Sequence, residues 1–163
     1  MAANEWVSSY WVNGSGVYII PPVAPSRVQS YYSQTMYLIT VDRSTHYVTV
    51  YYGSKGHRVQ LMGFSCGDGK ASTPTITGEY SIPNKYPRSR PYFDSEGARC
   101  WYPTRINGPY LFHSVLYYPS GSPTNIADGR LGAAVSHGCV RLAIDHAKWI
   151  YDNIPIGTKV VIH

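Results

Sequence analysis

The residue with the clearest chemical potential is Cys139, in the stretch Ser136-His137-Gly138-Cys139-Val140-Arg141-Leu142. Gly138 lets the backbone approach a ligand closely and adopt angles closed to other residues. A helical pattern begins just after this stretch, and the positive end of a helix dipole favours the thiolate form of a nearby cysteine. His113, in the apolar run Tyr110–Val115, supplies a base for the thiol if the two meet in the fold. These residues indicate a cysteine nucleophile.

Two other interpretations fit the same residues. A lone cysteine is usually a small buried apolar residue, and a lone histidine usually has its hydrogen bonds satisfied in a core or on a surface. Cysteine and histidine are also the usual ligands of zinc. However, His137 and Cys139 are too close in sequence for the usual ligand pairs, and no spacing here matches a zinc ribbon or finger. We therefore expect no metal and no cofactor.

Strands must position these side chains, because apolar residues alternate with polar ones through much of the chain. The pattern predicts strands over residues 36–41, 47–52, 58–64, 76–82, 100–106, 110–115 and 159–162. His113 would then project from a rigid strand. One helix is predicted from about residue 144 to Asn153, with His146 on it and outside the chemistry. The expected fold class is mostly β, with one principal helix after the nucleophile stretch.

Glycine, proline and polar residues predict loops over 66–74 and 117–131, and Asn107-Gly108 predicts a hairpin turn. A further excursion over 84–96 carries Lys85, Arg88 and Arg90. It is either a lid over the site or a solvated surface loop.

Length and composition indicate one globular domain, since 163 residues can bury a core unaided. The net charge of +5 attracts anionic polymers, but no long Lys/Arg run or recognition helix points to nucleic acid. No apolar stretch has the length of a membrane helix. Three cysteines suggest one pair and one free thiol. We predict a disulfide between Cys66 and Cys100, with two buried thiols as the alternative.

The stretch 136–141, with His113-Ser114 upstream, resembles the signature of the L,D-transpeptidases with a YkuD-type domain. The likeness runs from about Thr35 to the end of the chain. It departs from the family pattern in a long interval between His113 and Ser136, and in Arg141, where many members have Asn. The resemblance implies a β-sandwich-like catalytic domain over residues 35–163. Residues 1–34 would be an extension or linker, or the remnant of an upstream wall-binding region.

The resemblance implies that Cys139 attacks a peptidoglycan tetrapeptide stem at the bond before D-alanine, while His113 carries the proton. It also implies that the Ser114 carbonyl orients the imidazole and that the amides of Gly138 and Cys139 hold the oxyanion. An amine from a second stem would then form a 3-3 crosslink. Water would instead give L,D-carboxypeptidase action, and a free D-amino acid would give exchange. The sequence leaves these three outcomes open.

Substrate contacts are expected from residues of the same two stretches, namely Tyr110, Phe112, Ser136, His137 and Arg141, although Arg141 could brace the loop instead. Carbapenem β-lactams, which mimic the reactive amide, would acylate Cys139. A role in bacterial cell wall biogenesis and cell shape places the protein outside the cell or in the wall. No signal peptide is visible, so we interpret the start of the chain as truncated.

Three rival classes remain as alternatives. Papain-like and NlpC-type peptidases place the cysteine before the histidine, the reverse of the order of Cys139 and His113. A non-catalytic wall-binding module would carry an inert Cys139. A zinc protein would bind about one zinc per chain.

Overall fold

The computed structural model describes residues 21–86, 97–119 and 125–163, together with the backbone of four short strands outside these ranges. One five-stranded sheet has the order β6-β5-β4-β17-β8. Its strands are β4 (Tyr37–Asp42), β5 (Tyr47–Tyr52), β6 (Val59–Ser65), β8 (Gly78–Ser81) and β17 (Lys159–Ile162). The predicted antiparallel meander is confirmed in β4, β5 and β6, and β17 joins β4 in parallel.

A second five-stranded sheet carries the residues of the nucleophile stretch, in the order β11-β12-β16-β7-β15. The predicted hairpin is confirmed in β11 and β12, and β12 pairs in parallel with β16. The bounds are β7 (Gly67–Gly69), β11 (Thr104–Asn107), β12 (Tyr110–Ser114), β15 (Ala133–Ser136) and β16 (Val140–Leu142).

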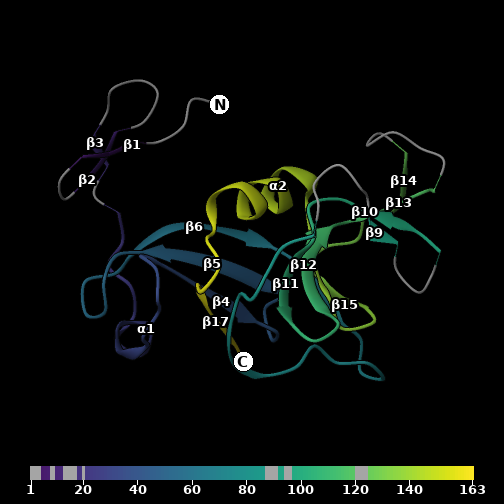
Figure 1. The fold of residues 1–163 in the computed structure, drawn as a ribbon, viewed down its shortest axis with the longest axis horizontal. Helices are drawn as coiled ribbons and strands as arrows, with labels where there is room; N and C mark the ends of the chain where they lie inside the picture. Colours follow the sequence, from purple (N-terminus) through teal and green to yellow (C-terminus); the bar gives the residue numbers. More distant parts are fainter. Residues whose placement is uncertain are drawn as a thin grey trace.

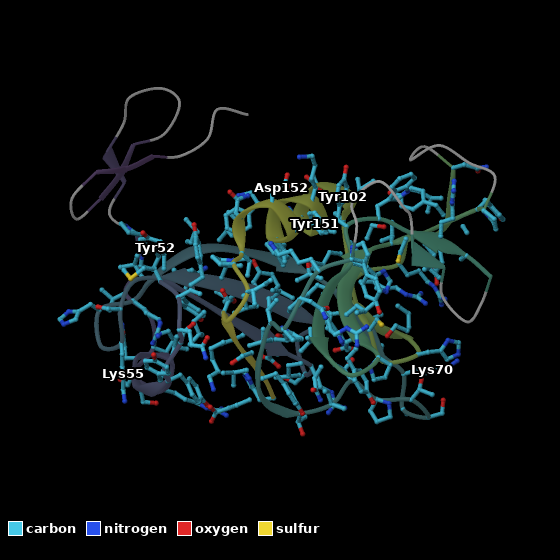
Figure 2. All side chains as sticks on the ribbon, in the orientation of Figure 1. Tyr52, Lys55, Lys70, Tyr102, Tyr151 and Asp152 are labelled. Atoms are coloured by element: carbon cyan, nitrogen blue, oxygen red, sulfur yellow. The ribbon has the colours of Figure 1, made fainter. Side chains whose placement is uncertain are left out.

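The predicted helix is α2 (Ile144–Asn153), which lies across the two sheets (Figure 1). Ala147, Ile150 and Ile154 are buried in one core cluster with residues from both sheets, such as Ile39 and Val140. His146 lies on α2 as predicted and stacks on Phe64, with ring centroids 4.4 Å apart. Tyr151, on α2, lies next to Tyr102 (Figure 2), with ring centroids 5.9 Å apart. The main core therefore ties the two sheets together beneath α2.

Two smaller sheets complete the structure. A four-stranded sheet joins β9 (Tyr92–Phe93), β10 (Arg99–Cys100), β13 (Leu116–Tyr117) and β14 (Ile126–Asp128) in the order β14-β13-β10-β9. The other joins β1 (Glu5–Val7), β2 (Tyr10–Val12) and β3 (Tyr18–Ile19). A short helix, α1 (Ser26–Ser30), buries Val28 against Leu38 and Tyr51. No helix among the described residues is long and apolar enough to cross a membrane.

The structure corrects the predicted Cys66–Cys100 disulfide, because the two side chains are not bonded to each other. Both are fully buried, but in different places. Cys66 follows β6 and belongs to the main core, whereas Cys100 packs with Ala98 and Leu116 in a separate small cluster. Each thiol acts as a small apolar residue of its own cluster.

All three predicted loops contain strands, with β9 in the excursion over 84–96. Residues 66–74 include β7, and residues 117–131 include part of β13 and all of β14. Gly-Asp-Gly in β7 lacks the apolar alternation that marks a strand, which is why the pattern missed it. The lid prediction falls mainly on residues 87–96, of which the structure describes the backbone of β9 (Tyr92–Phe93), so Arg88 and Arg90 lie outside the described residues. At its near end, Lys85 Nζ donates to Tyr151 O on α2 at 2.5 Å.

Candidate active site

Cys139 lies between β15 and β16, at the start of the strand that carries Val140. Its side chain is half-buried, and the thiol donates a hydrogen bond to the carbonyl of Pro109 at 3.5 Å. The three-residue strand β16 separates Cys139 from α2. That strand is roughly 10 Å of extended chain, whereas the effect of a helix dipole fades within one turn. The helix start therefore does not act on the thiol, contrary to the prediction.

His113 is buried in β12, with 2% of its surface exposed. Its Nδ1 lies 2.6 Å from the backbone carbonyl oxygen of Ser114. A carbonyl can only accept, so Nδ1 must carry the proton, and in the neutral ring Nε2 is then the basic nitrogen. The hydroxyl of Ser114 donates to Val115 O and accepts from the amide of Trp101, both at 2.8 Å. The residue that orients the imidazole is thus itself fixed.

The register of β12 and β16 brings His113 and Cys139 to one face of the sheet. The strands run parallel, with Phe112 opposite Val140 and His113 opposite Arg141. Side chains alternate along a strand, so Cys139, immediately before Val140, shares the face of Arg141. Adjacent strands lie only about 4.8 Å apart. The histidine and the cysteine therefore project to the same side from neighbouring strands.

Hydrogen bonds inside the stretch 136–139 hold the backbone around Cys139. The hydroxyl of Ser136 donates to the Cys139 carbonyl at 2.6 Å and accepts from the Gly138 amide at 3.0 Å. Gly138 has φ 121°, and a Cβ on it would meet Tyr110 Cε1 at 2.7 Å. Only glycine fits both the angle and the space. The Gly138 amide is thus occupied by Ser136 Oγ in this structure, and its contact with an oxyanion stays a prediction.

A second segment, residues 69–75, holds the stretch from outside. The buried hydroxyl of Thr75 accepts from the Gly69 amide and donates to the Gly138 carbonyl, both at 2.8 Å. Thr73 Oγ1 and the Lys70 amide donate to the Ser136 carbonyl at 3.2 and 3.0 Å. Sequence reasoning did not select Thr75 as a site residue, because a single threonine in a polar stretch has no distinctive pattern.

A groove of about 440 Å³ runs beside this stretch. Its lining residues are Arg43, Thr73, Pro74, Thr75, Ile76, Thr77, Tyr110 and His137. His137 is exposed, and its Nε2 lies 3.1 Å from Lys70 Nζ. Tyr110 and His137, two of the residues expected to bind substrate, therefore line the groove.

The other expected substrate-binding residues are buried. Phe112 is fully buried in the main core, Ser136 is 1% exposed and Arg141 is 2% exposed. Arg141 Nη1 donates to Asp128 Oδ2 at 2.9 Å, while Arg130 pairs with the same carboxylate. These three side chains support the site from within, and the burial and ion pair of Arg141 favour bracing for that residue; contact of the three with substrate stays a prediction.

Cys66 is buried, whereas Cys139 is half-buried. Burial raises the pKa of the Cys66 thiol to about 12, with further contributions from the carboxylates of Asp68 and Asp42. Asp68 is itself buried in β7 and lies 3.1 Å from His46 Nδ1.

Among the described residues, no group of three or more His, Cys, Asp or Glu side chains is placed to hold a metal ion.

Comparison with known proteins identifies related chains. A family model described as the L,D-transpeptidase catalytic domain, YkuD, matches residues 36–162. YciB of Bacillus subtilis is 46% identical over 67 residues, a segment that covers 41% of this chain and 34% of YciB. The chain thus spans about a third of the length of that relative.

Solved structures agree with this similarity. A fused Zn-dependent amidase/peptidase/peptidoglycan-binding domain-containing protein from Clostridium acetobutylicum has a TM-score of 0.68 at 33% identity, covering 89% of this chain and 65% of its own. An L,D-transpeptidase from Mycobacterium tuberculosis has a TM-score of 0.59 at 28% identity, covering 78% of this chain and 57% of its own.

Proposed function

This chain belongs to the YkuD family of L,D-transpeptidase catalytic domains, and we propose that it is a peptidoglycan L,D-transpeptidase with Cys139 as its nucleophile. The observation that carries the proposal is the register of β12 and β16, which sets His113 opposite Arg141. Because side chains alternate along a strand, Cys139 is expected on the same face as His113. The bond from His113 Nδ1 to Ser114 O leaves Nε2 as the basic nitrogen. Family membership supports acyl transfer as the reaction class.

The reaction begins when Cys139 Sγ attacks the carbonyl carbon between the diamino acid and D-alanine of a tetrapeptide stem. The C–S bond forms, the thiol proton passes to His113 Nε2, and the C–N bond then breaks as that proton moves to the departing amine. D-Alanine leaves a thioester on Cys139. An amine from a second stem attacks the thioester, forms the 3-3 crosslink and returns a proton to the thiolate through His113. The bonds and protons balance without a cofactor.

The groove beside the nucleophile is the proposed binding site for the stem peptide. Its wall carries the cation of Arg43, and no described carboxylate forms an ion pair with Arg43. Stem peptides carry carboxylates, which the planar guanidinium binds well. Tyr110 and His137 would contact the same substrate. A site acting on peptidoglycan places the protein at the bacterial cell wall.

The test is the intact mass of the protein after incubation with a carbapenem, for the unaltered chain, Cys139→Ala and His113→Ala. We expect one adduct that requires Cys139 and forms at least about a hundredfold more slowly without His113. His57→Ala, an exposed histidine outside the site, is the matched control and should react normally. A folded, unaltered protein that forms no adduct would favour a non-catalytic wall-binding module.

A second assay separates the three outcomes of the thioester. The protein is incubated with a tetrapeptide stem alone, with a second stem, or with a free D-amino acid. The products are identified by mass spectrometry. A crosslinked dimer supports transpeptidation, whereas a tripeptide or an exchanged tetrapeptide assigns the site to L,D-carboxypeptidase action or to exchange.

A further inference from the structure

The hydroxyl of Thr75 is the buried group that links the segment before the groove to the nucleophile stretch. Thr75 is 1% exposed. Its Oγ1 accepts from the amide of Gly69 and donates to the carbonyl of Gly138, both at 2.8 Å. A hydroxyl has one proton to donate, so these two bonds fix the direction of that proton toward Gly138.

The Gly138 carbonyl shares a peptide plane with the amide of Cys139. That peptide is trans, and in a trans peptide the C=O and the following N–H point in nearly opposite directions. Holding the carbonyl oxygen on Thr75 therefore turns the Cys139 N–H away from the buried side of the stretch. Gly138 has φ 121°, an angle that other residues rarely adopt. Because glycine has wide conformational freedom, the peptide plane between Gly138 and Cys139 needs such an anchor.

The neighbouring polar groups of the backbone are held separately. Ser136 Oγ accepts from the Gly138 amide and donates to the Cys139 carbonyl. Thr75 is thus the side chain that sets the direction of the peptide plane between Gly138 and Cys139. The backbone that supports Thr75 is closely packed, because a Cβ on Gly69 would come within 2.3 Å of Thr73 O and 2.4 Å of Thr75 N.

We propose that Thr75 is a positioning residue for acyl transfer, which aims the Cys139 amide at the oxyanion that forms when the thiol attacks a carbonyl. This inference rests on the proposed function. An amide aimed in advance stabilises the developing charge without reorganising at the moment of reaction. The reagent class that depends on Thr75 is therefore any carbonyl acyl donor. A reagent that reacts at saturated carbon forms no oxyanion and does not depend on it.

The experiment compares two reactions of the same thiol. A carbapenem acylates through a tetrahedral oxyanion, whereas iodoacetamide alkylates by displacement at saturated carbon. Both rates are measured by intact mass for the unaltered chain, Thr75→Val, Thr75→Ala and Thr75→Ser. The control is Thr104→Val, because Thr104 is fully buried and its hydroxyl has no hydrogen-bond partner among the described residues. Thermal unfolding confirms that each variant folds.

We expect Thr75→Val to slow acylation on the order of tenfold or more, while its alkylation rate and the pH profile of alkylation stay unchanged. Thr75→Ala leaves room for water beside Gly69 and Gly138. It therefore tests loss of the Thr75 hydroxyl if the valine variant does not fold. Thr75→Ser should retain the ratio of the two rates, and Thr104→Val should change neither.

Equal acylation by the folded valine or alanine variant would overturn the proposal. So would a parallel fall in both rates, because that would mean a general role in the loop or in thiolate formation. Failure of the proposed function has a different signature, since the unaltered protein would then alkylate at Cys139 but would not acylate.

Discussion

His113 Nδ1 is bonded to the backbone oxygen of the very next residue, Ser114, at 2.6 Å. A main-chain acceptor survives any side-chain substitution, so the tautomer of His113 does not depend on the serine hydroxyl. The hydroxyl instead satisfies the amide of Trp101 and donates to Val115 O. The orientation of the base and the stability of the strand are therefore separable properties of one residue.

Ser114→Ala should lower the free energy of unfolding by about 1–3 kcal/mol, because a buried amide loses its acceptor. The folded variant should still acylate with a carbapenem at close to the normal rate. Urea unfolding and the adduct assay measure the two effects. If acylation collapses while stability is unchanged, the hydroxyl takes part in the chemistry and the carbonyl alone is not sufficient.

Gly138→Ala should slow acylation at least about tenfold. A side chain at φ 121° costs roughly 1–2 kcal/mol, and its Cβ would lie 2.7 Å from Tyr110 Cε1. Adding Tyr110→Leu removes the ring but leaves the backbone strain, so the double variant should recover only part of the rate. Full recovery would mean that the clash alone, and not the backbone angle, requires glycine.

Arg43→Gln should raise KM for a tetrapeptide stem by about tenfold with little change in kcat, since one charged hydrogen bond is worth about 1.5–3 kcal/mol. Arg43→Lys, which keeps the charge, should lose less. Arg27→Gln, an exposed arginine on α1, is the control. A fall in kcat at constant KM would place Arg43 in transition-state stabilisation and not in substrate binding.

In the native protein at neutral pH, iodoacetamide should label Cys139 alone. Cys66 is buried with a pKa raised to about 12, so almost none of it is thiolate. After denaturation without reductant, Cys66 and Cys100 should both become labelled, as peptide mapping would reveal. Labelling of these two only after reduction would restore the disulfide that the structure contradicts.

Asp128→Asn should destabilise the protein at neutral pH but not in acid. Hydrogen bonds from Arg130, with the charges of Arg130 and Arg141, hold the pKa of Asp128 at about 2, below its ordinary 3.8. A lowered folded-state pKa means that this stabilisation is complete above about pH 4 and is lost as pH falls through 2. Urea midpoints of both proteins should converge across that window. A constant difference down to pH 2 would exclude the charge as its source.

Much of the fold could be predicted because its strands carry a strong local pattern. Residues 37–42 and 47–52 alternate, and Ile144, Ala147, Ile150 and Ile154 recur at helical spacing. Gly67–Gly69 has no such pattern, since it is a strand only through its partners β16 and β15. Tertiary pairing, and not local preference, decides the strand conformation of that segment.

The candidate nucleophile and base could also be selected in advance, because cysteine, histidine and glycine combine rarely. The residues that hold these two in place could not be predicted from the sequence. Thr75 acts through the direction of one hydroxyl, and Phe112 is core because of its place opposite Val140. The disulfide prediction failed because cysteine parity says nothing about distance, and Cys66 and Cys100 belong to separate clusters.

The strand order β12-β16-β7 has a kinetic consequence. The strand that begins after Cys139 lies between partners some seventy and thirty residues earlier in the chain. Such pairings close long loops before any contact offsets the lost entropy, so they form late and slowly. His113 cannot lie beside the thiol, and Thr75 cannot hold the Gly138 carbonyl, until both closures are complete. We therefore expect a partly folded chain to carry an ordinary cysteine, and the proposed reactivity of Cys139 to appear together with the finished sheet.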